Sequence, residues 1–300
     1  MNGPRQGRGR SHPVARSEPG DLPPMAWDRV VDDVDDAEVA PFVGLRDRPL
    51  RDQPQASAPN GRFLAEGDVV AARALAAGYR LLALLVDAQR VVPLPGAVRR
   101  ARLEGARVLG AGPGLLRAIT GASSHGGSLG VFARPAPRAP SEVLAGRRTV
   151  VVTEGVANPV NLGLIARSAV AMGAEALLVD PASADPFYRR ASRVSMGEVF
   201  AVPHARLDAL PGGLDPLRNA GFTLLALTPA TDALDIGALR AGDDDPVALL
   251  VGAEGPGLSS AVLGAADLRV RIPLSGGVDS LNVGAAAAVA AYALGRARGC

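Results

Sequence analysis

Short apolar runs alternate with segments of helical spacing along the second half of the chain. The runs that we expect to be strands are 149–153, 176–179, 199–202, 222–227, 247–251 and 268–272. The segments that we expect to be helices are 162–172, 215–220, 259–265 and 281–294. Apolar strands that alternate with helices indicate a parallel sheet with both faces covered. The pattern therefore predicts an α/β fold over residues 148–300.

A smaller α/β domain is predicted upstream, over residues 61–136. Residues 63–78 have helical apolar spacing and end on glycine, a usual helix stop. The aliphatic run 81–86 predicts a buried strand. The alternation continues through 108–109, 115–119 and 129–133. Three prolines fall within 135–140, which is typical of a linker, and we place this linker at 137–147.

Residues 1–60 are predicted to be a disordered tail. The first twenty residues carry Arg among Gly, Pro and Ser, and an acidic run follows at 28–38. A basic tail of this kind can hold RNA without sequence preference. A tail with no specific role fits the same composition.

Composition narrows the class of protein. All 32 cationic side chains are Arg, for which a GC-rich genome is the simpler explanation, although Arg forks also bind phosphate and stack on bases. The formal net charge of +2 is too small to indicate nucleic-acid binding, so any basic surface must be local. Cys300 is the one cysteine and the three histidines are far apart, so we expect no metal site. No apolar run has the length of a membrane span or a signal peptide, and we expect a cytoplasmic protein.

A glycine-rich segment, Gly252-Ala-Glu254-Gly-Pro-Gly257, follows the apolar run 247–251. It lacks the Lys-Ser/Thr of a phosphate-binding loop and has Glu254 at the middle glycine position of a dinucleotide fingerprint. Glycines there let a backbone approach a ligand closely, which favours an uncharged group such as adenosine. The alternative is an ordinary turn in which Glu254 is an exposed or helix-capping carboxylate.

Two further segments place polar residues at the mouths of strand–helix units, where open α/β sheets bind ligands. In the segment 272–283, Ser280-Leu281-Asn282 precedes an Ala-rich helix, and Ser280 alone could be an N-cap. In the segment 158–167, Asn161 and Arg167 lie six residues apart, and an N-cap and a surface ion pair are the alternatives.

In this order and spacing, the three segments resemble the signature motifs of the SpoU (TrmH-type) RNA ribose 2′-O-methyltransferases of the SPOUT superfamily. The resemblance covers about 150–294 and is faint before 140. It implies a trefoil knot in the last third of the chain, and residues 61–136 are similar to an L30e-like RNA substrate-binding domain. It also implies S-adenosylmethionine as cofactor, contacted by Gly252, Ile272 and Leu281, and a homodimer that buries the Ala-rich helix.

The resemblance assigns the catalytic set to Asn161, Arg167, Glu254, Ser280 and Asn282. Because Arg stays protonated it is a poor general base, and we expect Arg167 to grip a phosphate and to stabilise the developing 2′-oxyanion. The family often has Arg-x-Ser-x-Gly where this chain has Arg193, Ser195 and Gly197. Together with Tyr188, the cations Arg189, Arg190 and Arg193 would form an RNA-binding patch, and a plain solvated loop is the alternative.

We therefore expect methyl transfer from S-adenosylmethionine to a ribose 2′-hydroxyl of rRNA or tRNA, without a metal or a membrane. The rival is a non-catalytic RNA-binding or ribosome-assembly protein that kept the fold. The intact set of polar motif residues counts against this rival, and the missing glycine fingerprint counts against a nucleotide-dependent oxidoreductase.

Overall fold

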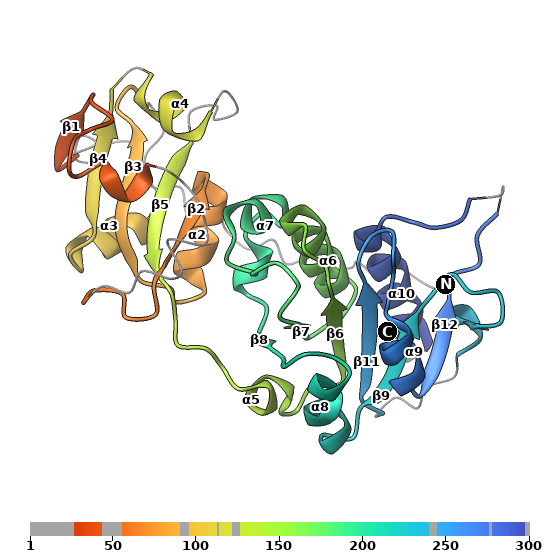
Figure 1. The fold of residues 1–300 in the computed structure, drawn as a ribbon. Helices are drawn as coiled ribbons and strands as arrows, with labels where there is room; N and C mark the ends of the chain where they lie inside the picture. Colours follow the sequence, from red (N-terminus) through yellow and green to blue (C-terminus); the bar gives the residue numbers. More distant parts are fainter. Residues whose placement is uncertain are drawn as a thin grey trace, which may run out of the picture.

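The computed structural model describes residues 27–43, 56–90, 96–112, 114–121, 127–239, 245–275 and 278–297. Two sheets, one from each half of the chain, lie side by side and are joined by a single crossing of the chain (Figure 1). Residues 1–26 and 44–55 of the predicted tail lie outside the described residues, as does the pair Gly276-Gly277.

The N-terminal sheet has five strands in the order β1-β4-β3-β5-β2. The strands are β1 (Arg29–Val31), β2 (Arg62–Glu66), β3 (Leu81–Asp87), β4 (Arg107–Ala111) and β5 (Ser128–Ala133). The helices are α2 (Asp68–Ala76), α3 (Gly96–Leu103) and α4 (Leu115–Thr120). Pairing is parallel for β1–β4–β3 and antiparallel for β3–β5–β2, so this sheet is mixed.

The prediction of a disordered tail over 1–60 is wrong for residues 27–43. Strand β1 pairs with β4, and a 3-10 turn at Ala40–Phe42 buries Phe42 completely in the core of the domain. The carboxylate of Asp28 accepts hydrogen bonds from the Val108 N–H and from Arg102. The acidic composition hid this strand because the flanking carboxylates of Asp28 and Glu38 pair with Arg102 of α3 and Arg107 of β4.

The helix predicted over 63–78 is in fact strand β2 followed by helix α2. Phe63 lies in the core that faces the C-terminal domain, whereas Leu64 packs into the opposite core of its own domain. Opposite faces for successive residues are the signature of a strand. Gly67, at φ +98°, separates the two elements.

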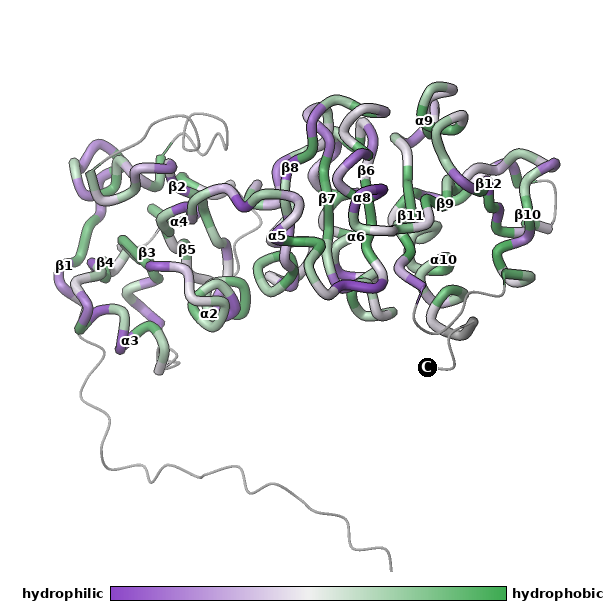
Figure 2. The backbone as a smooth tube through the Cα atoms, turned by 90° about the horizontal axis from the view of Figure 1, so that it is seen from below, coloured by the Kyte–Doolittle hydropathy of each residue, from purple (hydrophilic) through white to green (hydrophobic). Residues whose placement is uncertain are grey.

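The C-terminal sheet has seven parallel strands in the order β10-β12-β9-β11-β6-β7-β8. They are β6 (Thr149–Glu154), β7 (Ala176–Val179), β8 (His204–Arg206), β9 (Thr223–Leu227), β10 (Leu234–Asp235), β11 (Val247–Gly252) and β12 (Leu268–Arg271). The central strands are strongly hydrophobic (Figure 2), as expected for a sheet buried on both faces.

Helices cover both faces of this sheet, which confirms the predicted α/β architecture. One face packs against α6 (Pro159–Ala171) and α10 (Val283–Ala297), and α7 (Arg189–Val194) packs on α6. The other packs against α5 (Pro140–Leu144), α8 (Asp215–Asn219) and α9 (Ser260–Ala265). Along β6, Val151 points to the first core, while Val150 and Val152 point to the second.

The predictions of a strand at 199–202 and of a helix-free linker at 137–147 are wrong. Residues 199–202 do not form a strand: Glu198–Phe200 is a 3-10 turn, and the edge strand β8 begins at His204. The linker predicted at 137–147 contains helix α5, whose Val143 and Leu144 are buried against the C-terminal sheet. The free crossing between the domains is therefore shorter than the sequence suggested.

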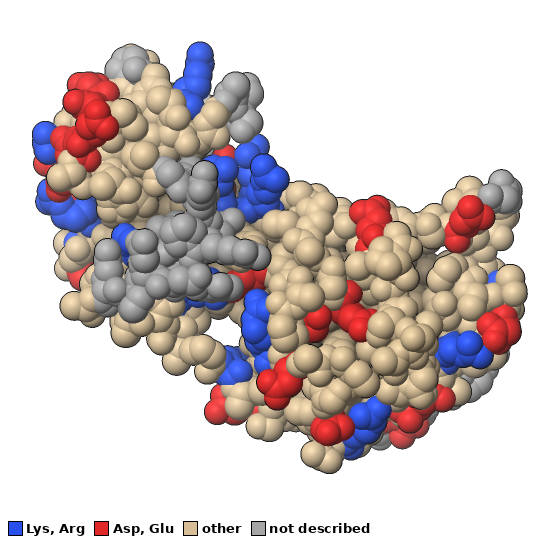
Figure 3. All heavy atoms as spheres, in the orientation of Figure 1, with Lys and Arg blue, Asp and Glu red and all other residues tan. Residues whose placement is uncertain are grey.

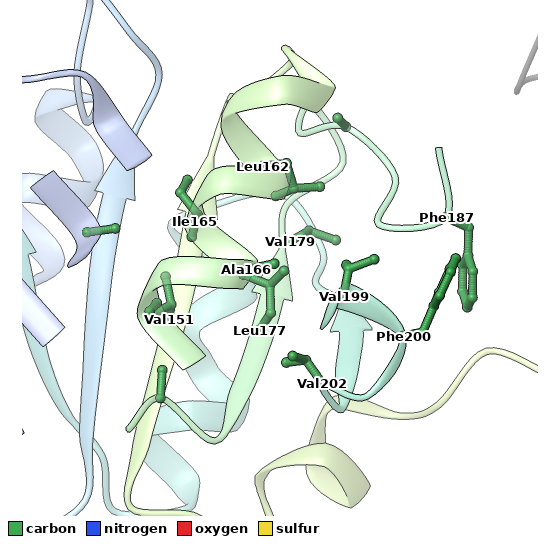
Figure 4. Close-up of a cluster of buried hydrophobic side chains, with 14 of the residues drawn as sticks. Val151, Leu162, Ile165, Ala166, Leu177, Val179, Phe187, Val199, Phe200 and Val202 are labelled. Carbon is green, nitrogen blue, oxygen red and sulfur yellow. The ribbon is translucent and has the colours of Figure 1, made fainter. Parts of the chain in front are cut away.

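The apolar run 199–202 is hydrophobic because it lies at the contact between the domains. Phe200 and Phe187 lie next to each other beyond the edge of the C-terminal core (Figure 4). The ring centroid of Phe63, on β2, lies 4.8 Å from that of Phe187 and 5.1 Å from that of Phe200. Aromatic pairs at these separations attract each other beyond simple burial, so the two domains share one core.

Candidate active site

A pocket of about 300 Å³ lies at the carboxyl ends of β9, β11 and β12. Since parallel strands end at the same edge of a sheet, this is where the sequence placed its candidates. Of these candidates, the pocket is lined by Gly252, Glu254, Ile272, Ser280, Leu281 and Asn282. The rest of the wall is mainly apolar or glycine, including Leu227, Val251 and Leu274.

Asn161, Glu254 and Asn282 form one hydrogen-bonded group at this pocket. Asn161 Nδ2 donates to Glu254 Oε2 at 2.9 Å, and Asn282 Nδ2 donates to Asn161 Oδ1 at 3.1 Å and to Glu254 Oε1 at 3.4 Å. The three residues come from the three predicted segments, so the group ties the start of α6, the loop after β11 and the start of α10 together.

Capping geometry explains how the two asparagines reach each other. Asn158 is the N-cap of α6, its side chain accepting from the Val160 N–H, which leaves Asn161 in the first turn and almost fully buried. Asn282 Oδ1 accepts from the Gly284 N–H at 2.9 Å and its carbonyl accepts from the Ala286 N–H. The alternative in which Ser280 caps this helix is therefore wrong, and Ser280 lies in the preceding loop.

Gly252 is required by the loop itself. A Cβ atom at this position would lie 2.1 Å from the Gly257 carbonyl carbon and 2.2 Å from the Leu258 nitrogen. The chain thus turns back over Gly252, and a bridge between Ala253 and Gly257 closes the turn. Gly252 lines the pocket, but its lack of a side chain serves the approach of backbone to backbone.

Glu154 is a positioning residue that the sequence analysis missed. It ends β6, and its Oε2 and Oε1 accept from the backbone N–H and the Oγ of Ser259 at 2.8 and 2.7 Å. Ser259 is also the N-cap of α9. Glu154 thereby fixes the far end of the glycine-rich loop, and its place at the carboxyl end of a strand was the available signal.

Arg167 does not line this pocket. It lies on α6 six residues after Asn161, which turns its side chain by about 120° around the helix and moves it about 9 Å along the axis. The residue is exposed. The neighbouring Leu164 packs against α10 at Gly284, where a Cβ would lie only 2.6 Å from the Leu164 Cβ. Arg167 is thus exposed to solvent on α6, one turn beyond Leu164, the residue that contacts α10.

Sequence similarity identifies the family to which the chain belongs. The model of the SpoU rRNA Methylase family matches residues 148–292. The chain is 42% identical over 237 residues to the uncharacterized tRNA/rRNA methyltransferase Rv0881 of Mycobacterium tuberculosis, covering 78% of this chain and 81% of that protein. The chain belongs to the SpoU family. The three segments that resemble the SpoU motifs all lie within the matched residues.

Two solved structures extend the similarity to both domains of this SpoU protein. The AdoMet-bound rRNA methyltransferase from Sinorhizobium meliloti has a TM-score of 0.72 and 26% identity, covering 89% of this chain and 97% of that one. A structure described as an RNA 2′-O ribose methyltransferase has a TM-score of 0.73 and 29% identity, covering 90% of this chain and 100% of that one.

The predicted Arg patch largely faces the N-terminal domain of the SpoU protein. Arg189 Nη1 and Arg193 Nη1 lie 3.2 and 3.0 Å from the two carboxylate oxygens of Glu66 on β2. On the same side, Arg73 of α2 pairs with Glu198 at 2.7 Å. Arg190 is exposed. Two of the three predicted RNA-binding cations thus help to hold the domains together.

The described part of the chain has neither a membrane-spanning helix nor a cluster of metal-binding side chains. None of its helices has the length and apolar character needed to cross a bilayer. It also shows no group of three or more His, Cys, Asp or Glu side chains arranged to hold a metal ion.

Proposed function

We propose that this protein transfers a methyl group from S-adenosylmethionine to a ribose 2′-hydroxyl in rRNA or tRNA. The observation that carries the proposal is the group Asn161–Glu254–Asn282, which joins three distant segments at one pocket. The similar proteins whose descriptions name AdoMet and ribose 2′-O methylation support the choice of cofactor and acceptor.

The pocket suits this cofactor. Leu227, Ile272 and Leu281 offer apolar surface for an adenine ring, and the turn at 252–257 offers backbone groups to its polar edge. Glu254 is a carboxylate in the wall, and its charge attracts the cationic sulfonium and ammonium groups. When bound, the cofactor would supply an activated methyl group, for which we propose Gly252, Ile272 and Leu281 as contacts.

The remaining chemistry is orientation and charge stabilisation. Methyl transfer needs an in-line approach of the acceptor oxygen, and holding both partners in that geometry removes much of the entropic barrier. We assign this positioning to Asn161, Glu254, Ser280 and Asn282. We assign Arg167 to the phosphate next to the target ribose, where a planar guanidinium can stabilise the developing oxyanion.

The position of Arg167 outside the pocket leads to a proposal about assembly. Helix α10, which packs beside α6, exposes Val289 and Tyr292 at 42% and 52%. We propose that α10 forms a two-fold interface, which would bring Arg167 of one protomer toward the pocket of its partner. We also propose that the last third of the chain forms a trefoil knot. For the N-terminal domain we propose an L30e-like role in binding the RNA substrate.

The direct test uses the full-length protein, isotopically labelled S-adenosylmethionine, and separate rRNA and tRNA pools from a strain lacking the gene. Digestion to nucleosides and mass spectrometry should find the label on a ribose 2′-oxygen, with EDTA present or absent. Label on a base would contradict the 2′-O assignment. RNA binding without any label incorporation in either pool would support the non-catalytic rival.

A further inference from the structure

A second and larger pocket lies where the linker passes the edge of the C-terminal sheet. It has a volume of about 830 Å³ and is lined by the linker residues 134–138, by the segment 200–206 and by Tyr79 of the N-terminal domain. Blue side chains form part of the rim of an opening between the linker and the body of the protein (Figure 3). None of the motif residues discussed above lines this pocket.

The charged groups of this pocket are predominantly cationic. Arg134, Arg138 and Arg206 line it, against the single carboxylate of Asp185. Burial lowers the pKa of His204, and burial raises the pKa of Tyr79, so both side chains are uncharged near neutral pH. The excess of positive charge selects an anionic ligand.

One of the cations is held in place before any ligand arrives. Arg134 Nη2 lies 2.8 Å from Asp185 Oδ2, and its guanidinium carbon lies 4.5 Å from the centre of the Phe187 ring. Asp185 is itself almost completely buried. Because a guanidinium has five N–H donors and this contact uses one nitrogen, the fork retains donors for a phosphate.

The walls of the pocket supply apolar and aromatic surface next to this charge. Tyr79 is half-buried, and Pro135 and Pro137, between β5 and α5, are exposed, whereas Phe187 and Phe200 reach the pocket from the buried contact between the domains. Cationic forks beside aromatic and proline surface are what a nucleotide requires, since its phosphate needs charge and its base needs a flat contact.

We propose that this pocket binds one nucleotide of the RNA substrate, with its phosphate at Arg134 and Arg138 and its base against Tyr79, Pro135 and Pro137. This rests on the proposed function. Strand β8 lies three strand positions from β11, which is roughly 14 Å across the sheet. One RNA can therefore occupy this pocket and reach the methyl-transfer pocket at the same time.

The test uses Arg138, which is exposed and in the linker, so its substitution leaves the domain contact intact. The RNA that the wild-type protein is found to methylate serves as the ligand, in unmethylated form. Its affinity for each variant is measured by fluorescence anisotropy over a series of salt concentrations. Arg138→Ala should weaken RNA affinity about fivefold or more and reduce the slope of log K against log salt by about one, the effect of one lost phosphate contact. Arg138→Glu should weaken it further.

Affinity for S-adenosylmethionine and the turnover rate at saturating RNA should stay unchanged in both variants. Arg269→Ala is the matched control, because Arg269 is a half-exposed cation on β12 near the opposite edge of the sheet. It should change neither the affinity nor the salt slope by a comparable amount.

Three outcomes separate the alternatives. Unchanged RNA affinity and salt slope in Arg138→Glu would overturn the proposal while leaving the proposed methyltransferase function in place. If a nucleoside monophosphate binds the wild type but not Arg138→Ala, and RNA affinity is unaffected, the ligand is a free nucleotide and the RNA assignment is wrong. Failure of the wild type to bind or methylate any RNA would refute the proposed function itself.

Discussion

The side-chain amide of Asn161 donates to the carboxylate of Glu254 at 2.9 Å, although the two residues lie 93 positions apart in the chain. Asn282 then closes the group by donating to both. Asn161 is 5% exposed, so its amide has no ready substitute in water. This bond makes the shape of the pocket depend on the packing of α6.

Replacing Asn161 tests that dependence. Asn161→Ala should lower the free energy of unfolding by about 1–3 kcal/mol, because it removes the two hydrogen bonds that Asn161 makes with Glu254 and Asn282. It should also weaken S-adenosylmethionine binding in calorimetry. Asn158→Ala is the control: it removes the N-cap of the same helix, should cost about 1 kcal/mol, and should leave cofactor affinity near that of the wild type. Equal loss of cofactor affinity in both variants would contradict a specific role for Asn161.

Gly252→Ala should displace the glycine-rich loop. The new Cβ would lie 2.1 Å from the carbonyl carbon of Gly257, and the backbone must move to relieve this contact. We expect lower thermal stability together with loss of cofactor binding. Gly264→Ala on α9 is the matched control, because a Cβ there meets nothing within 4 Å. It should be neutral or stabilise the protein by up to about 1 kcal/mol. A stable Gly252→Ala protein that lost only cofactor affinity would show that the side chain fills the ligand's space instead.

The contact between the domains can be loosened at Glu66. Glu66→Ala removes the shared partner of Arg189 and Arg193, and we expect a loss of about 2 kcal/mol in stability, less than for a fully buried pair because Arg193 is 45% exposed. The KM for RNA should rise while the kcat at saturation changes little. The control Arg269→Ala breaks an exposed pair with Asp232 in the C-terminal domain and should change neither. An unchanged KM would show that RNA binding does not depend on this contact.

The hydrophobic pattern predicted the layered C-terminal sheet, because its strands are buried on both faces and its helices follow each strand. It was wrong at 199–202 and at 63–66, where apolar side chains serve a contact between domains that local periodicity does not reveal. It also missed β1, because the acidic residues around this strand pair with Arg102 and Arg107, far along the chain. The motif residues were found from their spacing in the sequence. However, the hydrogen bond from Asn161 to Glu254 and the position of Arg167 outside the pocket depend on the rotation of α6 about its axis. No spacing rule supplies that rotation.

Acidification should destabilise the protein through His204. Burial lowers the pKa of this imidazole below its ordinary value, and it outweighs the opposing effects of the hydrogen bond with the Val202 carbonyl and of the Asp185 carboxylate. Below the unfolded pKa of about 6.5, the unfolded chain binds a proton that the folded chain does not, so stability falls as the pH drops. Denaturant unfolding at a series of pH values should show this slope, and His204→Gln should reduce it. An identical slope in the variant would assign the pH dependence to other groups.

The last prediction concerns Arg167 and combines catalysis with assembly. Arg167→Ala should keep its affinity for S-adenosylmethionine, because the residue lies outside the pocket, yet lose methyl transfer by about a hundredfold or more. Arg167→Lys should restore little, since a point charge cannot replace the planar fork. If Arg167 acts across a two-fold interface, co-expression of Arg167→Ala with Gly252→Ala should yield mixed dimers with one intact composite site and part of the wild-type activity. Sedimentation should first show that each variant is dimeric. Absence of any complementation in verified mixed dimers would place Arg167 in its own protomer's reaction, and near wild-type turnover by Arg167→Ala would remove it from catalysis altogether.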